Sequence, residues 1–135
     1  MRINKEVTAK IKEKTRRTET VAFEINGEEY TVEVSTFFSM PIREKMIETV
    51  QLLTEENVEN FGEEILGLFI YVKLMTNIEW SEVLAEDIEL FISLLEFGIV
   101  NKILDVIPES TIKEMSDFLI QIANAEKMIQ MELSE

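Results

Sequence analysis

Carboxylates are the side chains that this 135-residue chain offers in greatest number for chemistry. It holds 27 Asp and Glu, 13 Lys and Arg, and no histidine or cysteine. Without histidine the chain lacks the commonest general base and metal ligand, and without cysteine it lacks thiolate nucleophiles, thiolate metal sites and disulfides. Ser–His and Cys–His nucleophilic pairs are therefore excluded.

Two groups of carboxylates fall close together in the sequence. The first is Glu55, Glu56, Glu59, Glu63 and Glu64, and the second is Glu79, Glu82 and Glu86. Hard cations bind such oxygens, but no calcium-loop pattern is present and no pair of glutamates stands apart as a glycosidase pair would. The four glycines lie too far apart for a phosphate-binding loop. We therefore interpret the carboxylates as a solvated acidic face and expect no metal, no cofactor and no enzyme activity.

The basic residues gather at the N-terminus. Residues 1–17 contain Arg2, Lys5, Lys10, Lys12, Lys14, Arg16 and Arg17 against Glu6 and Glu13, which gives 7 − 2 = +5. Since the whole chain carries −14, residues 18–135 carry −19. This division predicts a basic arm, residues 1–18, on an acidic domain, residues 19–135, and it bears on partners more than on fold.

The arm also carries apolar residues at helical spacing. Ile3, Val7 and Ile11 are four residues apart, so a helix here would show a narrow apolar stripe among lysines. Such a helix is too short to be stable alone. Two interpretations stay open, a loose terminus or an arm that docks its stripe on a partner.

A β-hairpin is predicted over residues 20–34. Asn26-Gly27 suits the positive φ angles of a type I′ turn, and alternating apolar residues flank it. This turn sets Phe23 opposite Tyr30 and Val21 opposite Val32 on one face. Because a two-stranded ribbon is marginal by itself, that face must pack on the helices or on strands of another subunit.

The remainder predicts about five helices, so the fold class is α+β, a mostly α-helical single domain with one N-terminal β-hairpin. Ser39, Thr54, Ser81 and Ser110 are the expected helix starts, and Gly62, Gly98 and Pro108 the expected breaks. Residues 63–75 are apolar around most of a helix, which predicts the central, most buried element.

Trp80 is the aromatic residue of greatest interest for binding. The other aromatic side chains lie at or near apolar helical positions, where core packing is the expectation. Trp80 falls at a predicted connection between helices, where its ring could close the core or anchor a partner. We take it, with the seven basic residues of the arm, as a candidate interaction residue.

Signals for export or for the membrane are not apparent in the sequence. The longest apolar run, residues 65–72, has eight residues, whereas a bilayer requires about 20. The basic start is not followed by the apolar stretch of a signal peptide. We expect a cytoplasmic protein.

The chain resembles small accessory proteins of tailed bacteriophages and of prophages of Gram-positive bacteria, including tail assembly chaperones. The similarity rests on Phe23 to Tyr30 and on Tyr71 to Ile78, within a region spanning about residues 20–80. Such chaperones are thought to coat apolar surfaces of a tape-measure protein. The resemblance implies a non-enzymatic binder in a bacterial host cell, in the cytoplasm or associated with the virion, and it assigns no functional residue.

The sequence thus favours an assembly protein that binds other proteins and itself. The alternative is an acidic decoy or inhibitor that occupies the nucleic-acid-binding surface of a basic protein. Direct nucleic-acid binding by the arm is less favoured, because the acidic body would repel phosphates. We expect protein partners and a homo-oligomer, with no specific nucleic acid and no membrane.

Overall fold

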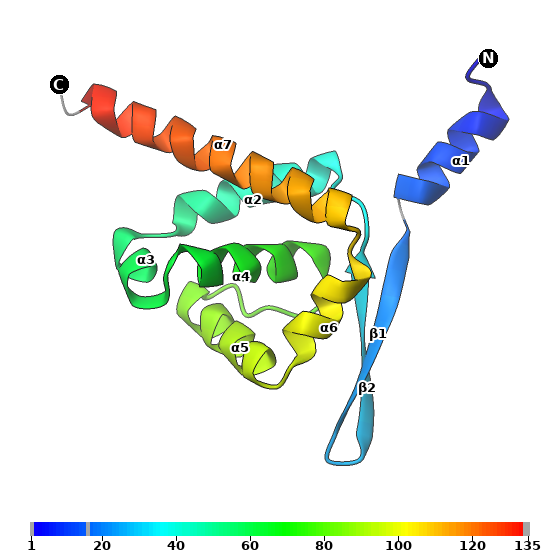
Figure 1. Cartoon of the computed structure of the whole chain (residues 1–135), viewed down its shortest axis with the longest axis horizontal. Coiled ribbons are helices and arrows are strands. Elements are labelled where there is room, and N and C mark those ends of the chain that lie inside the picture. Colours follow the sequence, from blue (N-terminus) through cyan, green and yellow to red (C-terminus); the bar gives the residue numbers. More distant parts are fainter. Residues whose placement is uncertain (1, 16, 134–135) are drawn as a thin grey trace.

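A computed structural model describes residues 2–15 and 17–133, with side chains for residues 2–13 and 17–126. In chain order the elements are α1 (Lys5–Thr15), β1 (Thr18–Ile25), β2 (Glu28–Ser35), α2 (Met40–Leu52), α3 (Glu55–Phe61), α4 (Glu63–Met75), α5 (Leu84–Glu96), α6 (Ile99–Val106) and α7 (Glu109–Leu133). Figure 1 shows the helices as one body, with the hairpin along one side and α1 beyond it.

The mostly helical α+β class with a hairpin is confirmed, but the expected number of about five helices is wrong. The described chain contains seven, one in the arm and six in the body. Gly62 and Gly98 adopt φ angles of 84° and 81°, which a helix cannot contain, so α3 and α6 are separate short helices.

The hairpin forms in the predicted register. Phe23 pairs with Tyr30 and Val21 with Val32, and the strands extend one or two residues beyond the predicted range. Asn26 and Gly27 at the turn have φ angles of 51° and 84°. Such angles are accessible to Asn and Gly at low cost, which explains why this dipeptide fixes the register.

Only the base of the hairpin packs on the helices. Val21, Val32 and Val34 are buried there, and β1 contacts α6. The Glu33 amide donates to Asn77 Oδ1 at 2.9 Å, and the Asn77 amide donates back to the Glu33 carbonyl at 3.1 Å. The turn end projects past α5 and α6 (Figure 1).

Helix ends follow local chemistry where the sequence supplies it. Ser39 precedes α2, and Thr54 forms a capping box with Asn57 at the start of α3. The predicted starts at Ser81 and Ser110 are wrong. α5 begins at Leu84, because Ser81 bonds to a carboxylate further along the chain, and α7 begins directly after Pro108, whose carbonyl accepts the first helical hydrogen bonds.

The core is built around α4, as its composition predicts. This helix contacts α2, α3, α5, α6 and α7, and Phe69, Ile70 and Val72 on it are fully buried. The Phe69 and Phe91 rings meet edge to face with centroids 5.7 Å apart. On the α7 side, an added Cβ at Gly67 would lie 3.7 Å from Leu119, so the two helices pack closely.

Three segments meet at Thr36, just after β2. Its amide and its hydroxyl both donate to the Arg17 carbonyl, at 3.3 and 3.1 Å. Its own carbonyl accepts from the Thr111 hydroxyl at 2.9 Å, from the first turn of α7. The end of the arm, the base of the hairpin and the start of the last helix are therefore joined at one residue.

Candidate functional site

The basic arm forms a helix that stands outside the body. Asn4 caps α1, because its Oδ1 accepts from the Val7 amide at 3.0 Å and its carbonyl accepts from the Thr8 amide at 2.9 Å. Ile3 and Ile11 are 73% and 49% exposed, and Val7 is half-buried. Ile3 precedes the cap, so only Val7 and Ile11 of the predicted stripe are on α1, a helix that Figure 1 places beyond the hairpin.

The candidate basic residues divide into three sets. Arg2, Lys5, Lys10 and Lys12 are exposed on or just before α1. Arg17 is at the base of the hairpin, where its guanidinium pairs with Glu19 at 3.0 Å. Arg16 and the side chain of Lys14 lie outside the described residues. Arg17 is therefore tied to the hairpin as well as to the arm.

Trp80 lies in the body, on the segment between α4 and α5. Its ring meets Phe69 edge to face, with centroids 5.9 Å apart and planes at 83°. It is half-buried, and its Nε1 is buried without a hydrogen-bond partner within the described chain. Trp80 closes one side of the core, and the structure does not bring it together with α1.

A groove of about 690 Å³ runs beside Trp80. Its walls come from α2, the end of α4 and the segment between α4 and α5, and include Lys45, Thr49, Leu52, Ile78 and Glu79. Leu52 is 66% exposed at its edge. The groove combines apolar and charged side chains, and the described residues that line it form no set of convergent groups that would define a reaction.

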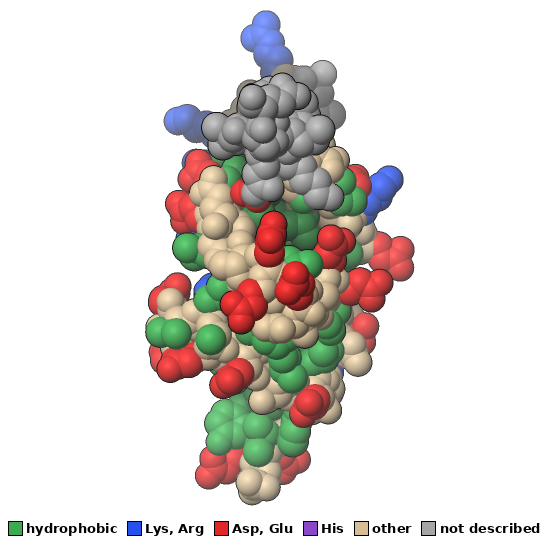
Figure 2. Space-filling model, turned by 90° about the vertical axis from the view of Figure 1, so that its left-hand side faces the viewer, with side chains coloured by type: hydrophobic (Ala, Val, Ile, Leu, Met, Phe, Trp, Pro, Cys, Tyr) green, Lys and Arg blue, Asp and Glu red, His purple; other side chains and the backbone are tan. Residues whose placement is uncertain are grey.

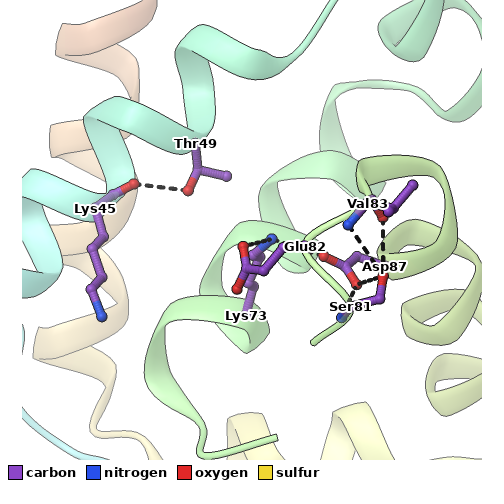
Figure 3. A network of polar contacts seen from close by, with 7 residues as sticks. All are labelled: Lys45, Thr49, Lys73, Ser81, Glu82, Val83 and Asp87. Carbon is purple, nitrogen blue, oxygen red and sulfur yellow. Dashed lines mark hydrogen bonds and ion pairs between the residues drawn. The ribbon is translucent and has the colours of Figure 1, made fainter. Parts of the chain in front are cut away.

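The most specific polar arrangement is a buried ion pair next to this groove (Figure 3). Lys73 Nζ on α4 lies 3.0 Å from Asp87 Oδ2 on α5, with side-chain exposures of 14% and 1%. Asp87 Oδ1 accepts from the Ser81 amide at 2.8 Å and from the Ser81 hydroxyl at 2.9 Å. Glu82, at a φ of 67°, lies 3.8 Å from Lys73 Nζ.

The surroundings of Asp87 favour its charged form. Burial would raise the pKa of Asp87, but hydrogen bonds from Lys73 and Ser81 outweigh it and hold the pKa below its ordinary value of 3.8. Both carboxylate oxygens are occupied by donors, which leaves little capacity to accept a proton from a substrate. The arrangement fixes the segment between α4 and α5 against the core.

Sequence reasoning missed this network. Lys73 ends the longest apolar run, and a lysine at the border of a buried helix was a usable signal for a buried partner. The partner itself is 14 residues away and could not be inferred from spacing.

The surface of the body is acidic, as its composition predicts. Figure 2 shows carboxylates spread over one face, while apolar side chains gather at the lower end, where the hairpin turn projects. Phe23 and Tyr30 stack there with centroids 5.8 Å apart, and Tyr30 is 43% exposed. Phe23 packs against the edge of the core, and Tyr30 extends this apolar surface into solvent.

A metal site requires several ligating side chains close together, and a membrane span requires a long apolar helix. The described residues contain no group of three or more Asp or Glu arranged to hold a metal ion. None of their helices combines the length and apolar character needed to cross a bilayer.

No family model matches the chain, and neither a curated protein nor a solved structure matches it.

Proposed function

We propose that this chain is a non-enzymatic assembly protein that binds other proteins through α1. The observation that carries the proposal is the exposed helix α1, with Ile11 on it and Ile3 just before it in solvent beside basic side chains. An isolated helix of 11 residues is marginal in water. Docking its apolar stripe on a partner would stabilise it, so α1 has the properties of a recognition helix.

The charge distribution indicates which partner surface fits. The stripe requires an apolar groove, and the lysines beside it favour a groove with an acidic rim. Exposed charge pairs of this kind weaken as salt rises, since the screening length falls from about 8 Å at 0.15 M to about 3 Å at 1 M. Binding through α1 should therefore be salt-sensitive but not abolished, because its apolar part persists.

The resemblance to tail assembly chaperones supplies the biological setting of the proposal. In that setting the protein acts in a bacterial host cell, in the cytoplasm or on the virion, and its partners are structural proteins of a phage or prophage. The carboxylate-rich body supports the same view, since it disfavours binding of nucleic acid.

A pull-down from the native host tests the proposal. The full chain should capture a phage structural protein, identified by mass spectrometry, and the variant with Ile3, Val7 and Ile11 all changed to Ser should lose it. Ile120→Ser, at an exposed position on α7, is the control that should retain it. Capture of a basic DNA-binding protein that DNA competes away would favour the decoy instead. Tight, salt-resistant binding of DNA would overturn the proposal.

A further inference from the structure

The outer edge of β1 has free backbone hydrogen-bonding groups. In an antiparallel pair, the backbone groups of alternate residues point away from the partner strand. Glu33 on β2 is such a residue, because its amide and carbonyl bond to Asn77. Its register partner is Thr20, so Thr20 points its groups outward on the opposite side, and Ala22 and Glu24 follow by alternation.

No backbone group of another described element bonds to this edge, although α6 packs on the strand where Val21 is buried. The backbone groups of Thr20, Ala22 and Glu24 bond to no other element there. The corresponding edge of β2 is covered in part, by Asn77 and by the bridge between Val34 and Thr76. β1 has no Pro, no Lys and no bulge in its eight paired residues, and Glu19 and Glu24 are its only charged side chains.

The side chains make antiparallel pairing with an identical strand favourable. In a register centred on Ala22, Glu24 faces Thr20 of a second copy, and Val21 faces Phe23 of that copy. No glutamate then faces a glutamate, and the apolar face becomes continuous across the two hairpins. The small Ala22 side chain at the axis permits close approach.

Charge favours the antiparallel over the parallel arrangement. The hairpin carries Glu19, Glu24, Glu28, Glu29 and Glu33, and no Lys or Arg between residues 18 and 35. Antiparallel pairing places Arg17 of one copy opposite Gly27 of the other, beside Glu28. A parallel arrangement would instead align each glutamate of β1 with itself.

We propose that β1 pairs with β1 of a second copy of this chain about a two-fold axis at Ala22, which gives a four-stranded sheet. The two hairpins, each marginal by itself, then form a single four-stranded sheet with one apolar face. This inference is independent of the partner proposed for α1, and either can fail without the other.

Disulfide cross-linking tests the register. Because the chain has no native cysteine, an introduced cysteine is the only thiol that can react. Ala22→Cys should form a disulfide-linked dimer in air, because facing residues of neighbouring strands have Cα atoms about 5.5 Å apart. Thr31→Cys is the matched control, since Thr31 faces Ala22 within the hairpin. Two copies of Thr31 would be three strand spacings apart, roughly 14 Å, which is too far for a disulfide. Equal cross-linking of the two variants, or none of either, would overturn the proposed pairing.

A proline variant tests the edge itself. Ala22→Pro removes an amide that points away from β2, so the hairpin should persist while pairing with a second copy is lost. Sedimentation equilibrium should show a dimer for the parent and a monomer for Ala22→Pro, with similar circular dichroism spectra. If Ala22→Pro fails to fold, Ala22→Lys gives the same comparison. A parent chain that stays monomeric at high micromolar concentration would overturn the proposal.

Discussion

Lys73 and Asp87 form an ion pair of 3.0 Å between α4 and α5, with both charges largely withdrawn from water. Among the described residues Lys73 has no second carboxylate partner of the same quality, since Glu82 lies 3.8 Å from its ammonium and is 80% exposed. The pair therefore joins α4 to α5 inside the body, and the only other donor to the Asp87 carboxylate among the described residues is Ser81.

Removing one member of this pair should be costly. Asp87→Asn leaves Lys73 without its buried partner, and Lys73→Met leaves Asp87 without its own, so each should lower the free energy of unfolding by about 3–5 kcal/mol. The double variant Lys73→Met, Asp87→Asn should lose less than the sum of the two single variants. Denaturant titrations of the four proteins measure this coupling, and additive losses would contradict it.

The same pair predicts a pH dependence. Because the pKa of Asp87 is lowered in the folded state, its contribution is fully present above the ordinary value of 3.8 and is lost as the pH falls through the folded pKa. The difference in unfolding free energy between the parent and Asp87→Asn should therefore be constant near neutrality and shrink below pH 3.8. A difference that persists at lower pH would show that Asp87 contributes through packing alone.

The turn of the hairpin should depend on Gly27. Its φ of 84° is unfavourable for a β-branched side chain, while nothing lies within 4 Å of the position that a Cβ would take, so the cost of Gly27→Val is conformational. We expect a loss of roughly 1–3 kcal/mol. Gly27→Asn is the control, because Asn tolerates positive φ and should lose less. Equal denaturation midpoints for the Val variant and the parent would contradict this.

Phe69 should be essential to the core. It is fully buried and contacts both Trp80 and Phe91, so Phe69→Ala should cost about 3–5 kcal/mol and leave little folded protein. Phe97→Ala removes the same ring from a position that is 62% exposed and should change stability little. Thermal unfolding of the two variants makes the comparison. A well-folded Phe69→Ala monomer that merely loses a partner would place α4 in an interface.

The arm should contribute to association and not to folding. Deletion of residues 1–15 removes α1 but keeps Arg17 and its bonds to Thr36. The thermal midpoint of the shortened chain should match that of the parent, while capture of the α1 partner is lost. A large fall in the midpoint would show that α1 is part of the folded core.

The turns, the helix breaks and the central helix could be predicted from the sequence because they depend on local chemistry. The Asn26-Gly27 turn, the breaks at Gly62 and Gly98 and the stop before Pro108 depend on backbone angles that few residues adopt, so they can be recognised without tertiary contacts. The buried character of residues 63–75 follows from composition alone.

The features that the sequence could not predict depend on tertiary contacts. The hydroxyl of Ser81 resembles any helix cap in the sequence, but in the fold it bonds to Asp87. The number of helices was underestimated in part because the sequence left open whether the arm is a loose terminus or a helix, and the structure contains α1 there. The sequence could name the basic residues of the arm and Trp80 as candidates, but it could not show that α1 lies outside the body, that Trp80 packs on Phe69, or that no other element bonds to the outer edge of β1 in the described chain.

The contacts at Thr36 determine how a force on the arm is transmitted to the rest of the molecule. A force applied to α1 reaches Arg17, from which the backbone continues into β1 and the carbonyl accepts from the amide and the hydroxyl of Thr36. From Thr36 the load divides, one part passing along β2 and the other through Thr111 into α7. A partner that pulls on the arm therefore strains the last helix as well as the hairpin, although α1 itself stands beyond both (Figure 1).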